Sequence, residues 1–220
     1  MASYLLRRSG IACGLVAEFL GWRADTMIQV GIGTAYEEVD VLMSEWPGLR
    51  VIGIEPHPGI VRQAMRKGKH ELILSMAASD CEGKGTLYVK RHHADGASLL
   101  AFPISQHVEE EEVFLTTLDS QFTDYHLLGR ILLWLDCEGS ELAALRGAEQ
   151  LIQHVDMVNV ELTARPLCQG WCSPKDVHRF LVEHDFIRQH VHTHRLSAGQ
   201  YDAIYVRNRL FKPEYSCDPF

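Results

Sequence analysis

The fold is decided by residues 26–56, which read TMIQVGIGTAYEEVDVLMSEWPGLRVIGIEP. Two short apolar runs, at residues 27–30 and 50–54, predict β-strands. Between them lie the glycine turn Gly31-Ile32-Gly33 and a stretch with helical periodicity that Pro47-Gly48 ends. A strand, a helix and a strand in this order predict a βαβ unit with parallel strands.

The glycine turn indicates a binding site. Glycines directly after a parallel strand let the backbone approach a ligand that a Cβ atom would exclude. Glu55 ends the second strand, 24 residues after Gly31, where its carboxylate can accept hydrogen bonds from both hydroxyls of a ribose. The unit therefore predicts a site for a nucleoside-containing cofactor. The alternative is a tight turn in an α/β domain that binds no ligand.

The residue after the turn bears on the identity of the cofactor. Dinucleotide-binding sequences carry a third glycine where this chain has Tyr36. This argues against NAD and FAD, although an NAD-linked oxidoreductase stays an alternative. A cofactor with a ribose and no pyrophosphate fits better, and S-adenosylmethionine is the commonest of these.

Composition limits the possible partners. The chain has 220 residues, enough for one α/β domain. A formal net charge of −8 argues against a broad surface for nucleic acid or anionic membranes. The six cysteines form no small disulfide framework, so we expect reduced thiols and a cytoplasmic protein. No apolar run is long enough to predict a membrane-spanning helix.

The chain divides into three expected parts: an N-terminal helix at residues 1–25, a cofactor-binding domain at 26–207, and a C-terminal tail at 208–220. Within the domain, residues 72–78 predict a third strand. Residues 91–112 lack periodicity and include an acidic run, so we expect an irregular loop there.

The end of the domain has a different pattern. Residues 186–192 and 202–206 predict two strands of an antiparallel hairpin.

A second group of polar residues follows a central strand. Residues 130–135 are an apolar run typical of a strand buried on both faces, and Asp136 and Glu138 come directly after it. Residues 155–162 predict the next strand, with Glu161 near its end. Burying a carboxylate destabilises the folded protein unless the group is paired with a hydrogen-bond donor or a positive charge, so such a residue often has a function. Ligands of open α/β sheets bind at this edge, so we expect a functional site there.

The segment LWLDCEGSE at residues 133–141, continued by LRGA at 145–148, resembles the hallmark of the FkbM family of class I S-adenosylmethionine-dependent methyltransferases. The similarity covers residues 26–207. It implies a Rossmann-like three-layer α/β sandwich whose mostly parallel seven-stranded sheet ends in the antiparallel hairpin. It also implies methyl transfer from S-adenosylmethionine to a hydroxyl of a sugar or another small molecule.

The resemblance also implies site residues. Gly31 and Gly33 would lie against the cofactor, Glu55 would hold its ribose, and Ala78-Ser79 would flank the adenine. The full expected cofactor-binding set is Gln29, Gly31, Gly33, Glu55, Pro56, Ala78, Ser79 and Asp136. The chain departs from the family at Gln29, where an acid is usual, and at Gly33 and Ala35, where Asn and Gly are common.

A hydroxyl acceptor needs a base or a metal to take its proton. We expect the catalytic residues to be Asp136 and Glu138, then Glu161, with His192 and His194 following. The alternatives are structural: Asp136 and Glu138 as caps of the next helix, Glu161 as a hydrogen-bond partner, and the histidines as solvated hairpin residues.

Three further interpretations stay open. Zinc ligands are present at Cys168, Cys172, His178, His192 and His194, and oxygen ligands for another divalent ion at Asp136 and Glu138, although we assign no metal. Gln29 and the altered turn keep open a catalytically inactive cofactor-binding protein of the same fold. A small-molecule acceptor and a homodimer are the expected partners.

Overall fold

The computed structural model describes residues 2–34, 36–91, 93–103, 108–124, 128–193 and 199–211, without the side chains of residues 2–9, 93–95 and 193. Within these residues no helix is long and apolar enough to cross a membrane. The tail is described as far as residue 211 and includes the 3-10 helix η3 (Asn208–Leu210).

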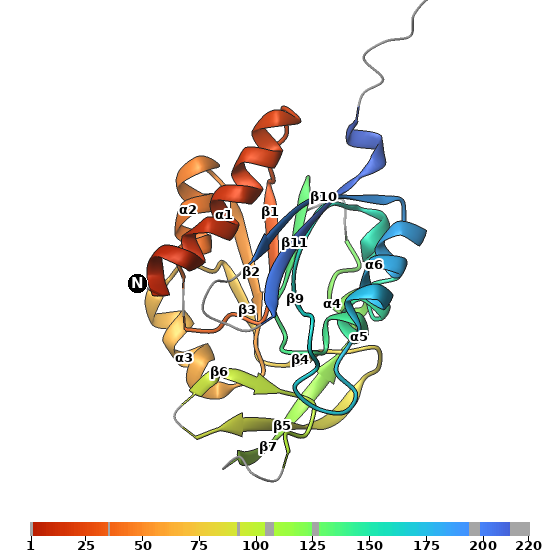
Figure 1. Cartoon of the computed structure of the whole chain (residues 1–220). Coiled ribbons are helices and arrows are strands. Elements are labelled where there is room, and N and C mark those ends of the chain that lie inside the picture. Colours follow the sequence, from red (N-terminus) through yellow and green to blue (C-terminus); the bar gives the residue numbers. More distant parts are fainter. Residues whose placement is uncertain are drawn as a thin grey trace, which may run out of the picture.

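A seven-stranded sheet forms the centre of the domain, in the order β10-β11-β9-β8-β1-β2-β3 (Figure 1). Its strands are β1 (Thr26–Val30), β2 (Arg50–Ile54), β3 (Leu72–Leu74), β8 (Ile131–Leu135), β9 (Val155–Thr163), β10 (Phe186–Thr193) and β11 (Gln200–Arg207). The neighbours from β3 to β9 pair in parallel, and β11 is antiparallel to both β9 and β10. This confirms the predicted mostly parallel sheet with its antiparallel hairpin.

Helices cover both faces of this sheet, which makes the three layers (Figure 1). On one face lie α1 (Ala2–Phe19) and α2 (Glu37–Glu45), and on the other lie α4 (Leu118–Gln121), α5 (Glu141–Arg146) and α6 (Pro174–Glu183). The described residues also form α3 (Pro58–Lys67) and the 3-10 helix η2 (Leu151–Gln153).

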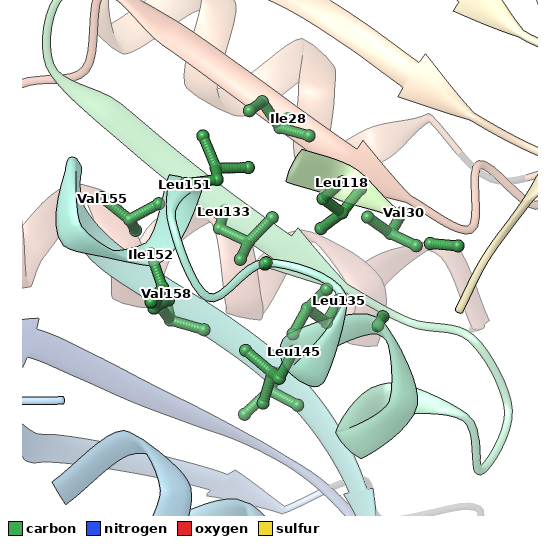
Figure 2. Close-up of a cluster of buried hydrophobic side chains, with 14 of the residues drawn as sticks. Ile28, Val30, Leu118, Leu133, Leu135, Leu145, Leu151, Ile152, Val155 and Val158 are labelled. Atoms are coloured by element: carbon green, nitrogen blue, oxygen red, sulfur yellow. The ribbon is translucent and has the colours of Figure 1, made fainter. Parts of the chain in front are cut away.

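The alternation of side chains along β8 shows how the layers form. Leu133 and Leu135 join a core with Leu145 of α5, as Figure 2 shows. Leu132 and Trp134 point to the opposite core, which includes Cys13 and Ala17 of α1. All five residues of β8 are buried, which confirms the prediction of a strand covered on both faces.

Glycine allows the two outer helices of one layer to approach closely. A Cβ atom on Gly10 of α1 would lie 3.2 Å from the Cα atom of Glu38 and 3.3 Å from the Cβ atom of Val41 in α2. Gly10 weakens a helix in isolation, but here it lets α1 pack against α2.

The third strand predicted at residues 72–78 is confirmed for residues 72–74, which form β3. The irregular loop expected at 91–112 was wrong, because parts of two strands lie there. The chain leaves the main sheet after Leu74, and a second sheet forms in the order β4-β7-β5-β6. Its strands are β4 (Ala77–Ala78), β5 (Gly83–Lys90), β6 (His93–Ser98) and β7 (Val108–Thr116).

The acidic run lies within β7 because cross-strand contacts stabilise it there. Lys84 of β5 pairs with Glu112 at 2.7 Å, and Arg91 pairs with Glu109 at 3.0 Å. Val113 packs in a small core with Leu87 and Val89 of β5. These partners are distant in sequence, so local periodicity did not reveal the strands.

Candidate functional site

A cavity opens at the carboxyl ends of β1, β2 and β8, where the sequence predicts the site. The main sheet and the segments that follow its strands contribute Val30, Gly31, Gly33, Ile54, Glu55, Pro56, Asp136, Cys137, Glu138 and Ser140. Ile60 of α3 also lines the cavity. The small sheet and the residue after β6 complete the lining with Ala77, Ala78, Leu87, Ala97, Ser98 and Leu99. The structure thus brings together six of the eight residues expected to bind the cofactor.

Gly31 is required by a contact within the protein. Its φ is +82°, and a Cβ atom there would lie 1.7 Å from the carbonyl oxygen of Asp136. The amide of Asp136 in turn donates to the carbonyl of Val30 at 2.9 Å. The glycine therefore permits the close approach of the segments that follow β1 and β8, and this approach shapes the cavity.

Glu55 is buried at the end of β2 and lines the cavity. Its carboxylate accepts hydrogen bonds from the amides of His57 at 2.7 Å and Ile32 at 3.1 Å. Burial raises its pKa to about 7, against the lowering effect of these amide bonds. Both oxygens keep lone pairs that can accept further donors from a ligand.

Gln29 lies beside the cavity and is not among the lining residues. Its side-chain oxygen is 2.9 Å from Nε2 of His70, which donates because the amide oxygen can only accept. Burial lowers the pKa of His70 to about 4, so the ring is neutral at pH 7. Gly53 pairs with Gln29 across β1 and β2, and a Cβ atom on Gly53 would lie 2.9 Å from His70. An amide at position 29 therefore fits a neutral imidazole.

Ala78 lines the cavity, whereas Ser79 is buried behind it. The amide of Ser79 donates to Thr116 at 2.8 Å, which continues the pairing of β4 with β7. A Cβ atom on Gly147 would lie 2.0 Å from the Ser79 carbonyl oxygen. The glycine in the 145–148 segment therefore allows the end of α5 to contact the strand that bears Ala78.

The three expected catalytic carboxylates meet at the edge of the sheet. Asp136, Glu138 and Glu161 each place one oxygen so that the three oxygens lie within 4.8 Å of one another. This spacing suits a divalent metal ion. Among the residues that the structure describes, these three are the group of acidic, histidine or cysteine side chains that could hold one. The expected oxygen-ligated site at Asp136 and Glu138 thus gains a third possible ligand.

Two further acids were missed by the sequence reasoning. Asp202 of β11 is paired directly with Glu161 of β9, and Glu38 of α2 faces the same region. Burial raises the pKa of Glu161 well above its usual range, with further contributions from Asp136, Asp202 and Glu138. Burial also raises the pKa of Glu38 to about 8, with Asp136 and Asp202 adding to the shift. No local pattern in the sequence pointed to either acid as a site residue.

The turn between β8 and α5 is bonded by Glu141, the first residue of α5. Glu141 accepts from the amides of Cys137 at 3.2 Å and Gly139 at 3.0 Å. Both amides belong to the turn before α5, and the sequence reasoning had given Glu141 no role there.

The described members of the zinc interpretation do not form a cluster of metal ligands. The Cys172 thiol donates to Glu141 at 3.0 Å, and His178 Nδ1 is 3.2 Å from the Tyr205 hydroxyl. His192 pairs with Asp202 across β10 and β11 and lines a groove beside α1. His194 lies outside the described residues.

Comparison with known proteins adds to this geometry. Residues 25–195 match the family described as the methyltransferase FkbM domain. A search of curated proteins found no match.

Two solved structures are similar to this one. Magnesium protoporphyrin IX methyltransferase from Synechocystis PCC 6803, with bound SAM, is 11% identical, with a TM-score of 0.51 over 91% of this chain and 79% of that chain. The bifunctional kinase-methyltransferase WbdD is 12% identical, with a TM-score of 0.51 over 93% of this chain and 39% of that chain. At these identities the likeness establishes a shared fold.

Proposed function

The chain belongs to the FkbM methyltransferase domain family, and we propose that it transfers a methyl group from S-adenosylmethionine to a hydroxyl of a sugar or another small molecule. One observation carries the proposal. The cavity that holds Glu55 also holds Asp136 and Glu138, so a ribose anchor and candidate proton acceptors share one site.

The residues that line the cavity fit the cofactor. Glu55 offers carboxylate lone pairs for ribose hydroxyls, and Ala78 offers a small side chain beside which a flat adenine can lie. Gly33, with a φ of +61°, brings backbone without a Cβ atom to the cavity wall. S-adenosylmethionine would supply an activated methyl group on a sulfonium.

The protein would contribute orientation, exclusion of water and proton transfer. Leu87 and Ala97 of the small sheet and Leu99, which follows β6, form an apolar wall, which reduces access of water. As the new C–O bond forms and the C–S bond breaks, the hydroxyl proton needs an acceptor. We assign this role first to Asp136 and Glu138, because both line the cavity. Glu161 follows them, since its carboxylate oxygen lies within 4.8 Å of theirs.

The alternative to a carboxylate base is a divalent metal ion that activates the acceptor hydroxyl. Asp136, Glu138 and Glu161 have suitable spacing for one, and an ion there would lower the pKa of the hydroxyl. A catalytically inactive cofactor-binding protein is the second candidate function, and the Gln29–His70 pair in place of the usual acid favours it.

A second copy of the chain is the proposed protein partner. β10 is an edge strand with exposed Ile187 and Val191, and α1 beside it exposes Ile11 and Leu15. An antiparallel pairing of two β10 strands about a two-fold axis would bring both α1 helices to the same face. Sedimentation of the wild type should then show a dimer that Val191→Lys dissociates; a monomeric wild type contradicts this.

Transfer of labelled methyl from S-adenosylmethionine to a panel of sugars and other hydroxylated small molecules tests the function. We expect an O-methylated product, lost in Glu138→Gln and unaffected by EDTA. Loss of activity in EDTA, restored by Mg²⁺, would instead assign the three carboxylates to a metal. Cofactor binding without transfer to any acceptor would favour the inactive protein.

A further inference from the structure

The turn at residues 136–140 supplies a large part of the cavity wall. Asp136, Cys137, Glu138 and Ser140 all line the cavity. Glu138 has a φ of +48° and Gly139 a φ of +96°, so the turn passes through the left-handed region. A non-glycine residue is unfavourable in this conformation, and it persists only where surrounding contacts hold it.

Glu141 provides these contacts from the protein interior. It is the first residue of α5 and only 2% exposed. One oxygen accepts from the amides of Cys137 and Gly139, on either side of Glu138. The other oxygen accepts from the Cys172 thiol. Its negative charge is also favourable at a helix N-terminus.

Two further segments bond the same turn. The Cys172 amide donates to the Gly139 carbonyl at 3.0 Å, and Trp171 lies 2.5 Å from where a Cβ atom on Gly139 would be. From the small sheet, the Ser98 hydroxyl donates to the Glu138 carbonyl at 2.7 Å. Glu141 is the contact that bonds amides on both sides of the strained residue, so the conformation of the turn depends on it most.

We propose that Glu141 is a positioning residue that fixes the turn so that Asp136, Glu138 and Ser140 face the cofactor cavity. This role rests on the proposed function, because the cavity that the turn shapes is the proposed cofactor site. Glu141 itself is absent from the lining and acts through the backbone of its neighbours.

The test is calorimetric titration with S-adenosylhomocysteine of the wild type and of Glu141→Ala, Glu141→Gln and Glu141→Asp. Removal of two hydrogen bonds to a charged acceptor should weaken binding about tenfold or more in Glu141→Ala. Glu141→Gln retains an oxygen for both amides and should stay within about threefold of the wild type. Glu141→Asp is shorter by one methylene, cannot reach both amides, and should lose affinity although it keeps the charge.

Asp119→Ala is the matched control. The Asp119 carboxylate also accepts from two backbone amides, those of Gln150 and Leu151, but it lies outside the cavity lining. This variant should lose thermal stability without a change in affinity for S-adenosylhomocysteine. Glu141→Ala and Glu141→Asp could behave like this control, with lower thermal stability but an affinity within threefold of the wild type. That result would refute the positioning role. Glu141→Asp decides the question if Glu141→Ala does not fold.

Amide hydrogen exchange without ligand separates the two possible failures. Faster exchange at Cys137 and Gly139 in Glu141→Asp would show that Glu141 holds the turn. If the wild type then bound no S-adenosylhomocysteine, the proposed function would be refuted, whereas the hold of Glu141 on the turn would stand. Unchanged exchange in a wild type that does bind the ligand would refute the positioning role alone.

Discussion

The close approach at Gly31 can be separated from its backbone conformation by three alanine variants. Gly31 has a φ of +82° and would place a Cβ atom 1.7 Å from the Asp136 carbonyl oxygen. Gly48 has a φ of +90° with nothing within 4 Å of the Cβ position. Gly147 has an ordinary φ, yet its Cβ atom would lie 2.0 Å from the Ser79 carbonyl oxygen. Gly31 therefore combines the left-handed conformation with a close contact. Gly48 has the conformation alone, and Gly147 has the contact alone.

The expected losses in free energy of unfolding follow from these numbers. Gly48→Ala should cost about 1–2 kcal/mol, the penalty of the left-handed conformation. Gly147→Ala should cost about 1–3 kcal/mol, the range for overpacking, because backbone must move. Gly31→Ala carries both effects and should cost about 2–5 kcal/mol. It should also weaken binding of S-adenosylhomocysteine, since the displaced Asp136 lines the cavity.

Urea unfolding followed by circular dichroism measures these costs, with an unchanged slope as evidence that the denatured state is unaffected. Gly48→Ala is the control for the conformation. Equal losses in Gly31→Ala and Gly48→Ala would refute the reasoning, because the contact with Asp136 would then have no cost.

Three other variants test neighbouring parts of the structure. Burial raises the pKa of Glu55 from 4.5 to about 7, so the folded state binds its proton more tightly. The stability of the wild type relative to Glu55→Gln should therefore fall as pH rises through this interval, in urea titrations at a series of pH values; a difference that does not change with pH would contradict this. Ser98→Ala removes the 2.7 Å bond between the small sheet and Glu138 and should speed dissociation of S-adenosylhomocysteine about tenfold in stopped-flow experiments, whereas an unchanged rate would show that this bond does not hold the wall. Arg207 is buried and donates to the carbonyls of Val155, His184 and Ile152, so Arg207→Met should cost about 3 kcal/mol or more in thermal and urea unfolding, and a loss below about 1 kcal/mol would be inconsistent with three orphaned carbonyls.

The strands of the main sheet could be predicted because their own local sequence patterns identify them. The apolar run at 130–135 is buried along its whole length as β8, and the glycine turn and Glu55 lie together at one edge. These features depend on periodicity and on the short connections of a βαβ unit. The fold class and six lining residues could therefore be predicted from sequence.

The rest depended on contacts between distant residues. β7 contains the acidic run, which is stabilised by Lys84 and Arg91 across the strands. Asp202 approaches Glu161 through the register of β9 with β11, which no local pattern specifies. The reason for Gly31 was likewise hidden, since its close neighbour Asp136 lies more than 100 residues away.

The central claim is that the cavity binds S-adenosylmethionine through Glu55. Calorimetric titration of the wild type and Glu55→Ala with S-adenosylhomocysteine tests it most directly. We predict saturable binding to the wild type and a loss of about 100-fold in affinity in Glu55→Ala, as expected for two lost hydrogen bonds to a charged acceptor. A folded wild type that does not bind, or a variant that binds equally well, would contradict the claim.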